Sequence, residues 1–294
     1  NIYKETSHPD LSLVTTSNNL QEPLESFCAT SAATGLATRL AARIKVENPQ
    51  LSMLSIRGLM IHSARWTEEM ERINKMEERM SLCGYGVPDE DIALFSNEKC
   101  ATYIFENHLK PYTEGDNCNI YGQMHYYDLP WPKELLEEMG IEDVRIRITL
   151  SYYVKPSPGY AGRTNKYRYP SATLRFDLKT ATETQEDFLC RRNKYEGEKT
   201  TDNETDRWNV KQQRRERGTV QSDWIKCTAA DLAEMDKIVV FPGPGWWRDR
   251  KLDNVDNIVS YSLIVSIETK ETDIYNAVET AIVNRIGIQI AQET

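Results

Sequence analysis

The sequence predicts a helical first part of α/β type followed by an antiparallel β-sandwich of jelly-roll-like form. Two observations predict this fold class. Apolar residues recur with helical spacing through the first hundred residues. From about residue 101, β-branched and aromatic runs alternate with turn residues, and no long helical pattern separates them. A boundary is therefore expected within residues 95–101, which gives domains of residues 1–97 and 98–294.

The first part is expected to contain three helices. The first is predicted from Ser31 to about Val46 because apolar residues recur there at every fourth position, and Asn48-Pro49 ends it. These apolar residues are Leu36, Leu40 and Ile44. The second helix begins after Ser52, a residue type that caps helix N-termini well. The third covers the charged segment 67–80, on the surface.

The second part is expected to consist of strands. In residues 144–151 apolar side chains alternate with Arg, Thr and Ser, which predicts a strand with one buried face and one solvent-exposed face. Lys133 to Met139 reads as a short helix on a crossover. The polar insertion Arg191 to Arg217 is expected to be a mobile loop. The candidate strands are Ala101–Glu106, Asn119–Tyr127, Val144–Val154, Ala172–Leu178, Lys237–Phe241, Val259–Glu268 and Ala281–Ile290.

Composition narrows the function class. The net charge of −9 argues against a protein whose main task is binding nucleic acid, which needs a basic footprint. No apolar run is long enough to span a membrane, and residues 1–10 lack the features of a signal peptide. Six dispersed cysteines and four histidines predict reduced thiols in a cytoplasmic protein, with no metal and no organic cofactor.

The strongest local pattern is a Ser among small residues at the start of the first helix, in Phe27-Cys28-Ala29-Thr30-Ser31-Ala32-Ala33. A hydroxyl at a helix N-terminus lies near unpaired N–H groups and the positive end of the helix dipole, which stabilise a developing oxyanion. Small neighbours allow a substrate carbonyl to approach. Taken alone, the pattern also fits an ordinary helix cap.

The surrounding motifs resemble the subtilase family of serine peptidases. Ala29-Thr30-Ser31-Ala32-Ala33, then Asn48-Pro49-Gln50-Leu51-Ser52 and His62-Ser63-Ala64, are similar to the nucleophile helix and the following helix of subtilases. Gly84-Tyr85-Gly86-Val87-Pro88 resembles the turn that closes their catalytic domain. The resemblance covers residues 26–96. It implies the α/β C-terminal portion of a subtilisin-like domain, with Ser31 as nucleophile of a serine endopeptidase that acts on peptide or protein substrates.

The chain departs from the family pattern in two respects. Ala29 stands where subtilases usually have Gly, and Gly35 stands near the position of a family Pro. None of the four histidines occurs in the family's His-Gly-Thr setting, and the family's catalytic Asp and His precede its Ser by more than a hundred residues. These histidines are His8, His62, His108 and His125. The triad Asp and His are therefore expected in an upstream segment or a separate chain, and this chain alone is expected to be inactive.

A non-catalytic interaction or scaffolding module, acting through the β domain, is the alternative. Other marked features favour structural roles. His62 lies mid-helix and reads as a packed or surface histidine. The charged run Gln212–Arg217 reads as hydrated surface, and the aromatic and basic residues of 160–169 read as an edge strand with its loop. Trp246-Trp247 reads as a plug over the sandwich core.

Overall fold

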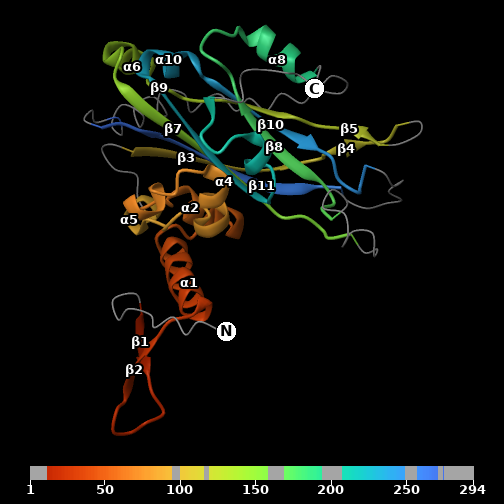
Figure 1. Cartoon of the computed structure of the whole chain (residues 1–294). Coiled ribbons are helices and arrows are strands. Elements are labelled where there is room, and N and C mark those ends of the chain that lie inside the picture. The colour runs from red at the N-terminus through yellow and green to blue at the C-terminus, as the bar shows by residue number, and fades with distance from the viewer. Residues whose placement is uncertain are drawn as a thin grey trace. The chain divides into compact units, whose positions relative to one another are not determined.

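The computed structural model divides into two compact units, Asn1–Gln50 and Leu51–Thr294 (Figure 1). The division by compactness falls earlier than residue 97 because helix α2, Met53–His62, packs against strands of the second unit. The predicted limit of the subtilase-like portion after residue 97 stays a prediction. The structure describes residues 12–94, 100–115, 119–157, 169–193, 207–248, 257–270 and 274.

The first unit contains a hairpin and a long helix. Strands β1 (Leu13–Thr16) and β2 (Leu24–Phe27) pair antiparallel, with Leu13 opposite Phe27. Helix α1 follows at once and spans Thr30–Glu47. It ends at Asn48 as predicted, because Pro49 has no N–H to continue the helix.

Short helices and long strands make up the second unit. Ser52 caps α2 as predicted, since its side chain accepts a hydrogen bond from the Ser55 N–H. In place of the single helix expected over 67–80 there are two short helices, α3 and α4, and residues 72–75 between them are not helical. The remaining helices are α3 (Glu68–Glu71), α4 (Met76–Cys83), α5 (Glu90–Leu94), α6 (Lys133–Met139), α8 (Gln185–Asn193), α9 (Gln212–Arg215) and α10 (Ala229–Glu234).

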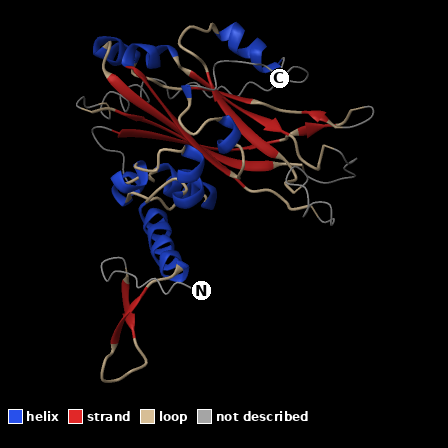
Figure 2. Ribbon diagram, in the orientation of Figure 1, coloured by secondary structure: helices blue, strands red, loops and turns tan. Residues whose placement is uncertain are grey.

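The second unit is built mainly on two larger β-sheets (Figure 2). One has the strand order β3-β11-β7-β9 and the other β6-β10-β8, and every pairing within them is antiparallel. A small sheet pairs β4 with β5. The strands are β3 (Cys100–Leu109), β4 (Tyr112–Thr113), β5 (Ile120–Tyr121), β6 (His125–Asp128), β7 (Asp143–Tyr152), β8 (Thr173–Leu178), β9 (Val220–Thr228), β10 (Lys237–Gly243) and β11 (Val259–Glu268).

One apolar core cluster includes residues from both larger sheets. Ile148 of β7 and Val265 of β11 belong to it, together with Phe176 of β8 and Val240 of β10. The expected plug is confirmed, because Trp247 is buried in the same cluster and Trp246 packs against it. The chain therefore has a mixed α/β fold with antiparallel sheets.

The expectation that β7 has one wet face is wrong. The polar side chains Arg147, Thr149 and Ser151 are as buried as the apolar ones that alternate with them. Helix α2 covers this face, and its buried Ser55 and His62 contact the hydroxyl groups of Ser262, Thr149 and Ser266 there. Gly58 permits the close approach: a Cβ atom there would lie 2.7 Å from Cδ1 of Ile264.

The insertion Arg191–Arg217 is only partly a loop. Residues 194–206 lie outside the described part of the chain, as do the predicted strand Ala281–Ile290 and most of the segment 160–169. Residues 207–217 are ordered around α9, and the interpretation of Gln212–Arg217 as hydrated surface is wrong for Arg215. Its guanidinium group is buried over the rings of Phe176 and Trp208.

Candidate active site

Ser31 is the second residue of α1, which confirms its expected position within one turn of the helix start. The helix begins after Ala29, whose backbone is extended and whose carbonyl accepts hydrogen bonds from Ala32 and Ala33. The Ser31 side chain is exposed. Its role as the nucleophile stays a prediction.

The N-terminus of α1 retains its positive character. No side chain caps it, and its first turn contains no acidic residue. The first N–H groups of a helix have no partner within the helix, and the dipole adds roughly half a positive charge at this end. The environment of the Ser31 hydroxyl therefore favours a developing negative charge.

The hydroxyl groups of α1 differ in how they are used. Thr34 Oγ1 donates to the Thr30 carbonyl and Thr38 Oγ1 to the Thr34 carbonyl, both at 2.8 Å. Within the described part of the chain, the Ser31 hydroxyl has no such partner. The hydroxyl of Thr30, the first residue of the helix, has no such partner there either, whereas those of Thr34 and Thr38 are engaged within their own helix.

The Ala at the family's Gly position causes no backbone strain. Ala29 has φ −165° and ψ 170°, an extended conformation that any residue adopts. The small side chain at position 29 is exposed. The departure from the family pattern therefore adds one methyl group beside Ser31 and leaves the main chain unstrained.

Of the two expected roles of His62, packed or at the surface, the structure shows the packed one. The residue is the last of α2 and does not lie mid-helix as expected. Its Nδ1 lies 2.9 Å from Thr149 Oγ1 and its Nε2 lies 2.8 Å from Ser266 Oγ, at 1% exposure of the residue. Burial lowers the pKa of His62 well below its ordinary value, and the charges of Arg147 and Arg65 lower it further. With both ring nitrogens engaged in the core, His62 is unsuited to act as a mobile general base.

Of the other histidines, His125 is also engaged in the core. His125 Nδ1 lies 2.7 Å from the hydroxyl of Tyr261 in the core. His108 lies near the end of β3 with an exposed side chain. His8 lies outside the described residues.

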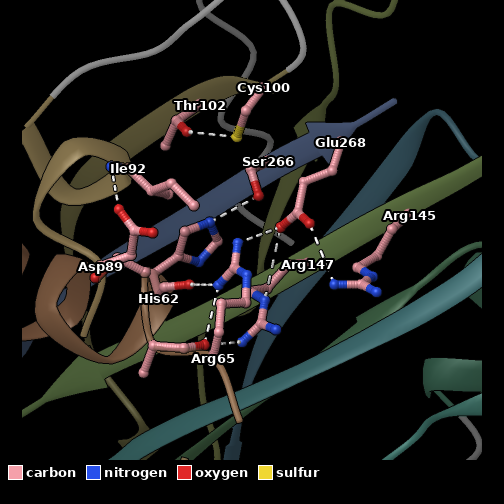
Figure 3. Close-up of polar contacts among 12 residues, drawn as sticks. His62, Arg65, Asp89, Ile92, Cys100, Thr102, Arg145, Arg147, Ser266 and Glu268 are labelled. Atoms are coloured by element: carbon pink, nitrogen blue, oxygen red, sulfur yellow. Dashed lines mark hydrogen bonds and ion pairs between the residues drawn. The ribbon is translucent and has the colours of Figure 1, made fainter. Parts of the chain in front are cut away.

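A charged network lies beside His62 (Figure 3). The carboxylate of Glu268 is 2.5 Å from Arg65, 3.3 Å from Arg145 and 3.9 Å from Arg147. Arg65 also donates to the carbonyls at the end of α2, so the network ties this helix to β7 and β11. Three guanidinium groups share one carboxylate here.

The sequence alone did not reveal this network. Its signal is present in retrospect: Ser262 and Ser266 interrupt an otherwise apolar strand on the side that faces α2, where they meet Ser55 and His62. A small hydroxyl inside a strand pattern reads equally as a solvent-facing residue, and only the helix packed over it decides between the two.

Among the described residues, no group of three or more His, Cys, Asp or Glu side chains is arranged to hold a metal ion. None of the helices in the same part of the chain is both long and apolar enough to cross a membrane.

Comparison with protein families bears on the N-terminal third of the chain. Residues 4–86 match the model of the subtilase family. This match confirms the resemblance found in the sequence motifs, and it includes Ser31, α1 and the turn at Gly84-Tyr85-Gly86. It supports a serine peptidase of subtilase type. A comparison with curated proteins gave no match.

Proposed function

We propose that this chain supplies the nucleophile helix of a subtilase-type serine endopeptidase, with Ser31 as the nucleophile. The proposal rests on the start of α1, which lies within the residues that match the subtilase family. The N-terminus of this helix is uncapped, and the Ser31 hydroxyl is exposed and lacks a partner in the described part of the chain. An ordinary capping serine would precede the helix and accept from its first N–H groups.

In the proposed reaction, Ser31 Oγ attacks the carbonyl carbon of a peptide bond while a histidine removes its proton. The leaving amine takes that proton, and water then hydrolyses the acyl-enzyme ester on Ser31. The N–H groups at the start of α1 stabilise the oxyanion. His62 and His125 are engaged in the core, and none of the four histidines stands in the family's His-Gly-Thr setting, so we infer that the Asp and His come from an upstream segment or a separate chain.

A serine-directed fluorophosphonate probe tests this proposal on the longest natural form of the protein. We expect covalent labelling that Ser31→Ala abolishes. Thr34→Ala is the matched control, because it removes a hydroxyl one turn further along the same exposed helix surface, and it should label normally. Labelling that survives in Ser31→Ala would refute the nucleophile assignment. Absence of labelling in every form would favour the interaction module instead.

We further infer that the β-rich part is an accessory sandwich of jelly-roll-like form that supports the catalytic portion. The support is a core cluster that includes residues of both larger sheets. A reducing compartment such as the cytoplasm fits the free thiols of the described cysteines Cys28, Cys83, Cys100, Cys190 and Cys227.

A further inference from the structure

The second unit contains a pocket whose charge is opposite to that of the whole chain. The pocket has a volume of about 540 Å³ and lies among the segment Ala64–Tyr85, strands β7 and β9, and residues 207–211. Seven Arg or Lys side chains and one acidic side chain, that of Glu71, line it. The chain as a whole has a net charge of −9, so this concentration of cations is local.

The carboxylates nearby neutralise these cations only in part. Asp177 lies 3.5 Å from Arg207, and Asp177 also pairs with Arg191. Glu268 alone is shared by three of the lining arginines (Figure 3). Arg79 donates to the main-chain carbonyls of Glu71 and Ile73. The side chain of Lys226 is exposed and forms no ion pair or hydrogen bond with any residue in the described ranges. The pocket therefore keeps an excess of positive charge.

One of the cations is buried with an unused donor. The Arg147 side chain is 2% exposed and lines the pocket, yet its Nε has no hydrogen-bond partner among the described residues. Burial lowers the pKa of Arg147 to about 9, and the nearby charge of Arg65 acts in the same direction. A buried donor without a partner is costly, and an anion in the pocket would supply the missing acceptor.

Tryptophan rings hold the arginines in place. The guanidinium of Arg147 lies 4.3 Å from the ring centre of Trp224, and that of Arg79 lies 4.7 Å from the ring centre of Trp66. The two indoles meet edge to face at 5.1 Å. Stacked guanidinium groups are pre-oriented forks, which suit bidentate binding of phosphate oxygens.

A residue with a strained backbone conformation also lines the pocket. Lys211, which lines it, is the sole non-glycine residue with positive φ in the described part of the chain, at 69°. The buried carboxylate of Asp223 fixes this conformation by accepting from the N–H groups of Val210 and Lys211 at 2.8 and 3.1 Å. Strained residues of this kind cluster at ligand sites.

From this arrangement we propose that the pocket binds a small molecule bearing a chain of phosphate groups. The volume is that of a small-molecule site, and the excess of cations demands more than one negative charge. An extended nucleic acid does not fit, because it needs a broad basic surface that this acidic chain lacks. The proposal does not depend on Ser31.

Isothermal titration calorimetry of the full chain tests the proposal with four probes: inorganic triphosphate, adenosine triphosphate, adenosine and oligoglutamate. We expect saturable binding of both triphosphates that weakens as salt is raised, and no binding of adenosine. Equal affinity for the two triphosphates identifies the phosphate chain as the ligand. Tighter binding of adenosine triphosphate identifies a nucleotide. Absence of triphosphate binding, or tighter binding of oligoglutamate, would overturn the proposal.

Substitutions then place the binding in this pocket. Lys226→Gln should weaken triphosphate binding about tenfold, since one charge-assisted contact is lost, and Lys226→Glu should weaken it further. Lys226 is exposed, so both variants should fold. Lys110→Gln is the matched control, because Lys110 is exposed and does not line the pocket. Equal affinity of Lys226→Glu, Lys110→Gln and the unaltered chain would show that triphosphate binds elsewhere, which would refute the site.

Discussion

At the scale of single residues, the difference between Ser31 and the later threonines of α1, Thr34 and Thr38, supports the functional argument. The hydroxyl groups of Thr34 and Thr38 donate hydrogen bonds to main-chain carbonyls of their own helix. Ser31 lies too close to the helix start for this, because the carbonyl four residues earlier belongs to the strand that precedes the helix. The position in the helix thus explains why this hydroxyl remains available.

The free helix terminus leads to a test at Ala29. In Ala29→Asp the new carboxylate should accept from the first-turn N–H groups and stabilise the unit by about 1 kcal/mol. The same bond removes a donor that the oxyanion needs, so labelling of Ser31 by fluorophosphonate in the longer form should slow at least about tenfold. Thermal unfolding and labelling rates measure the two effects.

Ala29→Asn serves as the control for charge. It makes the same cap without a negative charge, so it should also slow labelling, by a smaller factor. Labelling at an unchanged rate in both variants would show that the helix terminus plays no part in activating Ser31.

The buried His62 predicts a dependence of stability on pH. Its pKa is lowered in the folded state, so below about pH 6.5 the unfolded chain binds a proton that the folded chain refuses. Stability should therefore fall as the pH drops from 7 to 5, by up to about 1.4 kcal/mol per pH unit. Urea unfolding over this range measures the slope.

His62→Gln isolates the contribution of this histidine. The variant should be less stable at pH 7, because it disturbs the contacts with Thr149 and Ser266. Its stability should nevertheless change less between pH 6.5 and 5. If the variant kept the full slope, the acid sensitivity would belong to other groups.

At the scale of elements, α2 packs on the face of β7 and β11 that carries the polar side chains of their alternating patterns. Ser55 contacts Ser262 at 2.7 Å, and His62 reaches Thr149 and Ser266. Buried hydroxyl groups are acceptable here because they bond to one another, and such networks fix a unique register between helix and sheet.

The turn that follows α4 holds the charged network in position. Val87 and Arg65 exchange two backbone hydrogen bonds at 2.9 Å, which anchors Arg65 beside Glu268. Gly86 makes this pairing possible, with φ +101° and a hypothetical Cβ only 2.2 Å from the Arg65 carbonyl oxygen. Gly86→Ala should therefore lower the free energy of unfolding by more than about 3 kcal/mol.

Gly84→Ala is the comparison for that experiment. Gly84 also has positive φ, at +56°, but no atom lies within 4 Å of its hypothetical Cβ. This variant should show the conformational strain alone, about 1–2 kcal/mol. Urea unfolding of the two proteins measures the difference, and equal losses would mean that the contact with Arg65 is relieved at little energetic expense.

Elements with a strong local pattern were predictable from the sequence. The helix Lys133–Met139 and the strand Val259–Glu268 have the expected bounds, because periodicity and flanking turn residues define them. Strand β9 escaped prediction because Gln221, Ser222 and Asp223 break its apolar pattern. These side chains are buried against partners distant in the sequence, which no local pattern reveals.

At the scale of the whole molecule, the sequence predicted the two kinds of structure and the helix that begins beside Ser31, but not the division into units. The assignment of Ser31 came from its motif and its neighbours. The assembly of cations around the pocket could not be foreseen, since Arg65, Arg147 and Lys211 are far apart in the chain and meet only through α2 and the antiparallel register of β7 and β9.

The most direct test of the central claim is peptide cleavage by three proteins side by side: this chain, a longer form that includes an upstream Asp and His, and that longer form with Ser31→Ala. We predict cleavage by the longer form alone, because an unassisted Ser lacks a general base whose contribution is typically about 10²–10⁴-fold. Circular dichroism should show that Ser31→Ala folds normally. Undiminished cleavage by the Ser31→Ala protein would contradict the account.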